Sequence, residues 1–318
     1  MKRILSVSLT LAASLLLISE FQLSQNKPAE TPPPPIADCT ISFTAKSEAG
    51  IETVTMADYL PGVLAGEMPA LFETQALMAQ AVAARTYIMH RMQHGAPNHP
   101  EADICNNPAC CKAYVSQSQM QQNWGSHFEE YHAKVKGAVS ATDGQHLTYD
   151  GELIEAVFHS SSAGATEASS SIWNDRAYLV SVDSPETEAD VPNYISHVSF
   201  SPDILKTQLS EKYPDLEFTT EPAEWFSNFI INESGRVQSV QICQKELTGT
   251  QLRSALALRS TAFTVEYADG AFTFHVTGYG HGVGMSQYGA NVFAKQGLSY
   301  REILAHYYPN TQLTSAAG

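Results

Sequence analysis

The chain has 318 residues, of which 43% are hydrophobic and 9% aromatic, and its formal charge is -15. This length and apolar content suffice for one large domain or two small ones with a sizeable core. Its 18 basic residues are spread thinly against 33 acidic ones, whereas a protein that neutralises phosphates needs clustered Lys and Arg. The composition therefore argues against nucleic acid as a partner and favours uncharged or zwitterionic ligands.

The N-terminal segment predicts export from the cytoplasm. Lys2 and Arg3 precede an apolar run over residues 4–18. This run is shorter than the roughly 20 apolar residues that cross a bilayer comfortably, yet no clean small-x-small cleavage site follows it. We interpret residues 1–26 as a signal peptide, with an uncleaved membrane anchor as the alternative. The rest of the protein is expected outside the cytoplasmic membrane, with no other membrane contact.

A proline-rich stretch separates this segment from the folded part. Residues 27–38 include Pro32 to Pro35 and predict a stiff, extended linker. The folded domain is therefore expected over residues 39–318. In it, two or three good helices alternate with short strands that suit antiparallel pairing, which predicts an α+β, or mixed α/β, fold.

Two helices are predicted at the start of this domain. The first begins at a cap on Thr55 and ends before Pro69, because a proline ring disfavours helical geometry in the preceding residue. Glu67 therefore lies at a helix end. Apolar residues recur at helical spacing over 77–88, which predicts an amphipathic helix of about five turns. Arg85 lies in it and needs a carboxylate or a bound anion if it is covered. From spacing alone, the simpler interpretation of both charged residues is that they are solvated surface groups.

The cysteines form the next pattern along the chain. An odd number leaves at least one unpaired if the protein is exported to an oxidising compartment. Cys105 could close a small loop with Cys110 or Cys111, or all could be plain thiols. A zinc site normally needs four ligands, and there is no second CxxC pair and no His pair at zinc-finger spacing. We therefore predict no metal and no cofactor. The five cysteines are Cys39, Cys105, Cys110, Cys111 and Cys243.

Two further strands are predicted at 146–149 and 153–158, joined by a hairpin turn. His159 ends the second strand, and Ser160 and Ser161 open a small polar loop that suits a ligand-facing position. A histidine beside serines suggests a serine hydrolase. However, the GxSxG nucleophile elbow is absent, so a polar loop is the simpler interpretation.

Later patterns predict a capped helix over 202–212, a hairpin with strands at 229–231 and 237–242, and a short helix over 250–258. Before them lies Trp173. An aromatic ring can stack on the face of a sugar, but a core position is the simpler interpretation for this residue.

A glycine-rich loop over 278–284 follows a predicted half-buried strand at 272–276. Its unhindered backbone can approach a ligand closely and can point several N–H groups at one place. It is not a phosphate loop, because the GK[ST] sequence is missing. A helix capped by Ser286 is expected after it. Polar side chains gathered at such a loop favour a ligand cleft, and those predicted to line it are His281, Ser286, Gln287 and Tyr288.

Two stretches resemble the family of stage II sporulation protein D and the amidase enhancer LytB. They are GEMPALFETQALMAQAVAARTY, from Gly66, and GYGHGVGMSQYGANVFAKQG, from Gly278. Two segments between them, FHSSSAGATE and LRSALALRSTAF, look like the family's intermediate segments. The resemblance covers roughly residues 51–311 and implies a single curved domain with a substrate cleft.

The resemblance also implies an activity. The protein looks like a lytic transglycosylase that cuts peptidoglycan strands between N-acetylmuramic acid and N-acetylglucosamine and leaves 1,6-anhydro ends, with Glu67 as its acid. One carboxyl suffices if the substrate's own hydroxyl replaces water, whereas a hydrolase ordinarily needs a second carboxylate. Glycan strands are the expected partner, bound by Arg85, His159, Ser160 and Ser161 together with the glycine-loop residues.

The same resemblance allows an alternative, in which the protein is not an enzyme. Such a protein would bind peptidoglycan and stimulate a separate cell-wall amidase. Some members of the family carry cysteines that join the histidine equivalent to His159 around zinc. No cysteine occurs between Cys111 and Cys243, which agrees with the prediction of no metal there.

Overall fold

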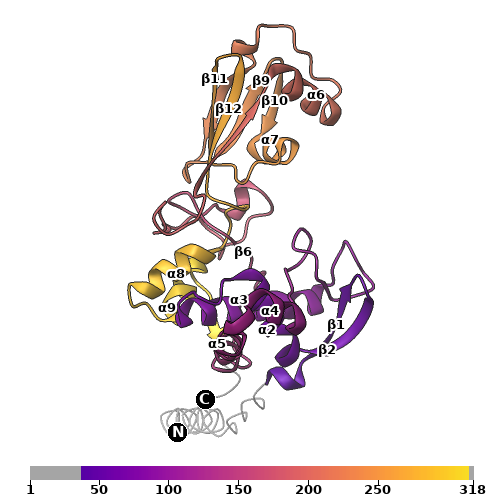
Figure 1. Ribbon diagram of the computed structural model, residues 1–318, viewed down its shortest axis with the longest axis vertical. Helices are drawn as coiled ribbons and strands as arrows, with labels where there is room; N and C mark the ends of the chain where they lie inside the picture. The colour runs from indigo at the N-terminus through magenta and orange to yellow at the C-terminus, as the bar shows by residue number, and fades with distance from the viewer. Residues whose placement is uncertain (1–36, 315–318) are drawn as a thin grey trace, which may run out of the picture. The chain divides into compact units, whose positions relative to one another are not determined.

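A computed structural model describes residues 37–314 and confirms the predicted mixture of helices and short, mostly antiparallel strands (Figure 1). The predicted export segment and nearly all of the predicted linker lie outside the described residues. Within residues 37–314, no helix combines the length and the apolar character needed to cross a membrane. Buried apolar side chains in this range gather in two hydrophobic cores.

The first core gathers elements from both ends of the described chain. The N-terminal ones are η1 (Asp38–Thr40), β1 (Ser42–Ser47), β2 (Gly50–Thr55), α2 (Met56–Glu67), α3 (Thr74–His94), β3 (Ile104–Cys105), α4 (Gln117–Trp124), η2 (Gly125–His127) and α5 (Phe128–Ser140). The later ones are β4 (His146–Tyr149), β5 (Glu152–Leu153), β6 (Phe158–His159), η3 (Ser169–Ser171), β13 (Met285–Ser286), α8 (Gln287–Lys295), α9 (Tyr300–Tyr307) and β14 (Gln312–Thr314).

The start and end of α2 follow from local sequence, as predicted. The Thr55 hydroxyl accepts a hydrogen bond from the Asp58 N–H and so caps the helix. Met68, which precedes Pro69, is extended, because the proline ring excludes the helical conformation there. Glu67 is therefore the last residue of α2, and the prediction of a carboxylate at a helix end is confirmed.

Helix α3 is the centre of the first core. Its alanines let neighbouring helices approach closely, since they add little side-chain bulk. It contacts α2, α5, α8 and α9, and Figure 1 shows the two C-terminal helices, in yellow, close to the N-terminal helices in purple. Five of its alanines have no exposed surface, namely Ala76, Ala79, Ala81, Ala83 and Ala84.

The strand predicted over 153–158 is only partly correct. Its ends belong to β5 and β6, but residues 154–157 between them are irregular. The Ala156 and Val157 N–H groups donate to the carbonyls two residues earlier, which turns the chain away from the β4–β5 hairpin. Because of this turn, β6 leaves the hairpin and pairs with β13 instead.

The second core lies under two three-stranded sheets, with strand orders β10-β9-β8 and β11-β12-β7. Its elements are β7 (Ile195–Phe200), α6 (Pro202–Lys212), η4 (Pro222–Glu224), β8 (Phe226–Ile231), β9 (Val237–Ile242), β10 (Lys245–Thr248), α7 (Gly249–Leu256), β11 (Phe263–Ala268) and β12 (Ala271–Thr277). The predicted helices and strands of this region are confirmed with small shifts at their ends.

This second group of elements is inserted into the first. Antiparallel pairing of β7 with β12 sets Ile195 opposite Thr277, and the Gly278 N–H donates to the Tyr194 carbonyl at 2.8 Å. The chain therefore leaves the first core and re-enters it at almost the same point. Parallel pairing of β6 with β13 then sets His159 opposite Ser286. The serine loop and the glycine loop, more than a hundred residues apart in sequence, lie side by side.

Candidate functional site

Two distant segments hold the Glu67 carboxyl group. The Ala113 N–H donates to Oε1 at 2.9 Å, and the Gln287 side-chain amide donates to Oε2 at 3.2 Å. Glu67 is only partly buried, so the carboxyl group is oriented by the protein and still accessible. Of the side chains predicted to bind substrate, Gln287 is thus placed beside the predicted acid and orients it.

Lys112 precedes the backbone donor to Glu67 and is 6% exposed. Its ammonium lies 3.9 Å from the centre of the Tyr87 ring and 3.6 Å from that of Phe158. Among the described residues, it has no hydrogen-bond or ion-pair partner at all. Burial lowers the pKa of Lys112 to about 8, and the Glu67 carboxylate acts against this shift. Lys112 is therefore mostly cationic at neutral pH.

Lys112 lines a pocket of about 380 Å³. Trp173 also lines it and is 49% exposed, with its ring centre 5.1 Å from that of His281. The interpretation of Trp173 as a core residue was therefore wrong, since the ring is available to a ligand. The pocket lining also includes Tyr87, Arg91, Cys110, Cys111, Glu155, Arg176 and His281.

His281 connects this pocket to the glycine loop. The Val283 N–H donates to its Nδ1 at 3.1 Å, and desolvation, with Lys112 adding to it, lowers the pKa of His281 to about 3. The ring is therefore neutral at neutral pH. Gly284 has φ +72°, a conformation that favours glycine. A Cβ there would lie 2.1 Å from the Val157 carbonyl oxygen, so the loop can take this path only with glycine.

His159 does not face a ligand, and its predicted substrate contact is wrong. It is 4% exposed, and burial lowers its pKa well below the ordinary value. Its Nδ1 donates to the Val283 carbonyl at 3.2 Å, so its Nε2 accepts from the Ser162 hydroxyl at 2.7 Å. Ser161 is 1% exposed and pairs through its backbone with Tyr279. Both predicted residues support the glycine loop from behind.

Ser286 is also buried, with no exposed surface. Its hydroxyl caps α8 and donates to Glu186, so the predicted cap is confirmed and the predicted substrate contact is wrong. Ser160 and Tyr288 are half-buried, and the Tyr288 N–H donates to the Ser160 carbonyl at 3.0 Å. Both side chains retain some exposed surface, and their role in binding stays a prediction.

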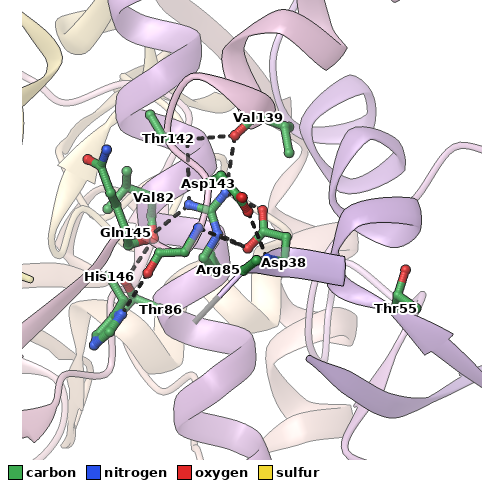
Figure 2. Close-up of polar contacts among 12 residues, drawn as sticks. Asp38, Thr55, Val82, Arg85, Thr86, Val139, Thr142, Asp143, Gln145 and His146 are labelled. Carbon is green, nitrogen blue, oxygen red and sulfur yellow. Dashed lines mark hydrogen bonds and ion pairs between the residues drawn. The ribbon is translucent and has the colours of Figure 1, made fainter. Parts of the chain in front are cut away.

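Arg85 has no exposed surface, so its predicted contact with substrate is wrong. Figure 2 shows its side chain directed toward Asp38. Its Nε and Nη2 donate to the two carboxylate oxygens of Asp38 at 2.6 and 2.7 Å, and its Nη1 donates to the Gln145 carbonyl at 3.0 Å. A buried guanidinium needs such a partner. Asp38, which the predicted linker included, is 3% exposed and belongs to the fold.

Three of the cysteines meet a histidine. The donor atoms of His99, Cys105, Cys110 and Cys111 all lie within 4.8 Å of one another, and each of these cysteines is a free thiol. The His99 Nδ1 is 3.0 Å from the Ala102 carbonyl, and its Nε2 is 3.0 Å from the Cys111 Sγ. One histidine and three thiols, with the second ring nitrogen held by a carbonyl, fit a tetrahedral structural zinc ion.

The prediction of no metal therefore missed His99, because it considered only finger-type spacing and the region after His159. The cluster immediately precedes Lys112 and Ala113 in the chain. It is thus in a position to fix the loop that presents these two residues. No spacing rule pointed to Lys112, Arg91 or Arg176, whose convergence depends entirely on the fold.

Comparisons with known proteins show which family the sequence matches. Residues 44–149, which contain α2, α3 and the cysteine loop, match the family model described as Stage II sporulation protein. Stage II sporulation protein D of Bacillus amyloliquefaciens is 35% identical over 277 residues, which cover 85% of this chain and 77% of that protein. Its counterpart in Bacillus subtilis is 34% identical, over 84% of this chain and 76% of that protein.

The chain therefore belongs to the stage II sporulation protein D family, as its sequence motifs predicted. It is also similar to the protein named Amidase enhancer of Bacillus subtilis, at 29% identity over 80% of this chain and 40% of the enhancer.

Proposed function

We propose that the protein is a lytic transglycosylase of peptidoglycan. The observation that carries the proposal is the Glu67 carboxyl group, oriented by Ala113 and Gln287 at the end of α2 and still partly accessible. Trp173 lines the same pocket as Lys112, the residue before Ala113, and offers an exposed ring on which a sugar face can stack. A carboxyl group oriented for proton transfer is the minimum that glycosidic bond cleavage requires.

Cleavage without water needs two proton transfers, and one carboxyl group can perform both. The muramic acid O6 hydroxyl attacks C1 of its own ring as the bond from C1 to the O4 of N-acetylglucosamine breaks. Glu67 donates its proton to the departing O4, and the carboxylate then accepts the proton that O6 loses. The products are an anhydro end and a free hydroxyl, and the acid is regenerated.

The carboxylates near the pocket favour this route over hydrolysis. Glu155 is the only carboxylate among the described residues that line the pocket, and it pairs with Arg91 at 3.1 Å. A hydrolase would ordinarily use a second carboxylate to activate water or to attack C1. With Glu155 engaged by Arg91, the substrate's own hydroxyl is the better nucleophile.

The names of the relatives support a biological setting for the activity. Because the relatives are named as sporulation proteins and an amidase enhancer, we place the activity in cell-wall remodelling, outside the cytoplasmic membrane. A cell-wall amidase is the protein partner that the enhancer's name suggests. No cofactor takes part in the proton transfers described above.

Incubation of the purified protein with peptidoglycan strands tests the proposal directly. Wild-type protein should produce anhydro-muramic acid ends without any added amidase. Glu67→Gln is nearly isosteric and should still bind strands, but it should lose the roughly 100-fold or greater acceleration that positioned proton transfer supplies. A variant that cleaves at the wild-type rate would show that Glu67 is not the acid.

The similarity to an amidase enhancer favours one alternative, a binding protein without chemistry. In that case neither wild type nor Glu67→Gln would form anhydro ends, and both would bind strands and stimulate an amidase equally. Formation of anhydro ends by wild type alone would exclude this alternative as a complete account.

A further inference from the structure

The pocket lined by Lys112 and Trp173 carries a local charge opposite to that of the whole protein. Lys112, Arg91 and Arg176 line it, against the single carboxylate of Glu155. The chain as a whole has 18 basic and 33 acidic residues. Three cations facing one anion in a single pocket of such an acidic protein point to a negatively charged ligand.

Lys112 gives this pocket a buried cation that can bind an anion. It is 6% exposed and lies between two aromatic rings, and among the described residues its ammonium has no carboxylate or carbonyl partner. A buried charge normally requires a partner. Since Lys112 lines the pocket, an anion bound there would supply the missing partner through a charge-assisted hydrogen bond.

The rim of the pocket adds further donors. Arg176 is exposed. Arg91 uses its Nε for Tyr87 and its Nη2 for Glu155, so its Nη1 has no partner among the described residues. Trp173 lies on the same pocket. A sugar stacked on this ring could therefore place an acidic substituent near the cations.

We propose that this pocket binds the carboxylate carried by the O3 substituent of muramic acid, with Lys112 as its principal donor and Arg176 at its rim. The inference rests on the proposed function for the identity of the glycan. In peptide-free strands this carboxylate belongs to the lactyl group, and in peptide-bearing strands it belongs to the stem peptide. Chitin oligosaccharides have neither, so the pocket distinguishes muramic acid glycans from uncharged ones.

Binding measurements in the Glu67→Gln background test the proposal without cleavage. The three probes are peptide-free strands, peptide-bearing strands and chitin oligosaccharides. Lys112→Met keeps the length and apolar packing of the side chain. It should weaken binding of at least one muramic acid probe about tenfold or more, as expected for one lost hydrogen bond to a charged group. Binding of chitin oligosaccharides should not change.

Two further variants keep the result interpretable if Lys112→Met folds poorly. Arg176→Gln changes an exposed residue and should cause a smaller loss with the same selectivity. Lys212→Met removes an exposed lysine at the end of α6, away from the pocket lining, and should change nothing.

The muramic acid probe that loses affinity identifies the source of the carboxylate, lactyl or peptide. An equal loss on all three probes, or no loss on any, would overturn the assignment. Because the assay needs no cleavage, its outcome is separate from that of the transglycosylase proposal. Selective binding by a wild-type protein that forms no anhydro ends would leave the pocket assignment standing and refute the enzyme.

Discussion

Replacing Asp38 by Asn tests the buried ion pair that ties the start of the domain to α3. Asn has almost the same shape as Asp but lacks its charge. Its amide oxygen can accept only one of the two short hydrogen bonds that Arg85 donates, at 2.6 and 2.7 Å. The guanidinium would then remain charged in a site where its side chain has no exposed surface.

The expected loss of stability follows from this geometry. Removing one partner of a buried ion pair typically costs about 3–5 kcal/mol, because the other charge is left uncompensated. Solvent screening reduces this loss of stability only slightly, since the side chains of Arg85 and Asp38 are 0% and 4% exposed. For a domain of this size, each kcal/mol lowers the melting temperature by about 2–4 °C. Asp38→Asn should therefore melt roughly 6–20 °C below wild type.

Thermal unfolding followed by circular dichroism, with urea unfolding as a second measurement, checks this expectation. The matched control is Glu101→Gln, which removes one partner of the exposed ion pair between Lys46 and Glu101. Exposed pairs contribute little, so this variant should melt close to wild type. If Asp38→Asn melts as high as the control variant, the buried pair does not stabilise the fold as argued here.

Four further predictions concern the site. Gln287→Ala should lower kcat for anhydro-end formation about tenfold with KM and melting temperature unchanged, because it removes one of two groups that orient Glu67; an unchanged kcat would contradict this. Gly284→Ala should fail to fold, because its Cβ would meet the Val157 carbonyl, whereas Gly50→Ala, also at positive φ but with nothing within 4 Å, should be soluble and folded. Burial sets the pKa of His281 near 3, below its unfolded value of about 6.5, so its contribution to stability is complete above about pH 6.5 and declines as the pH falls toward 3. His281→Gln should therefore lose less stability than wild type between pH 6.5 and 4 in melting experiments. Metal analysis should find one zinc per chain, and chelation or Cys111→Ser should lower the melting temperature; metal-free protein with an unchanged melting curve would exclude a structural zinc.

Features set by neighbouring residues could be predicted from the sequence. The end of α2 at Glu67 depends on the steric effect of Pro69 on the residue before it, and the start of α8 depends on a serine cap. In the second core, local patterns predicted the helices α6 and α7 and the strands β8, β9 and β12, but not β7, β10 or β11. The family motifs, which are also local runs of residues, identified the family and pointed to Glu67 as the proposed acid.

Burial and long-range partners could not be predicted in this way. Arg85 was assigned to substrate because its partner, Asp38, is 47 residues away and carries no local signal. The donor to Glu67 from Gln287 spans 220 residues. It exists because β6 pairs with β13 and returns the glycine loop to the first core.

The sequence by itself determined where the helices end, which family the chain belongs to and which carboxyl group stands at a helix end. Only the tertiary structure decided which polar residues face a ligand and which support the loops from behind. The reason is that capping and periodicity act over a few residues, whereas burial depends on how distant elements pack. His159 and Trp173 show this most clearly, since the first is buried and the second is exposed at the pocket, opposite to what their local sequence suggested.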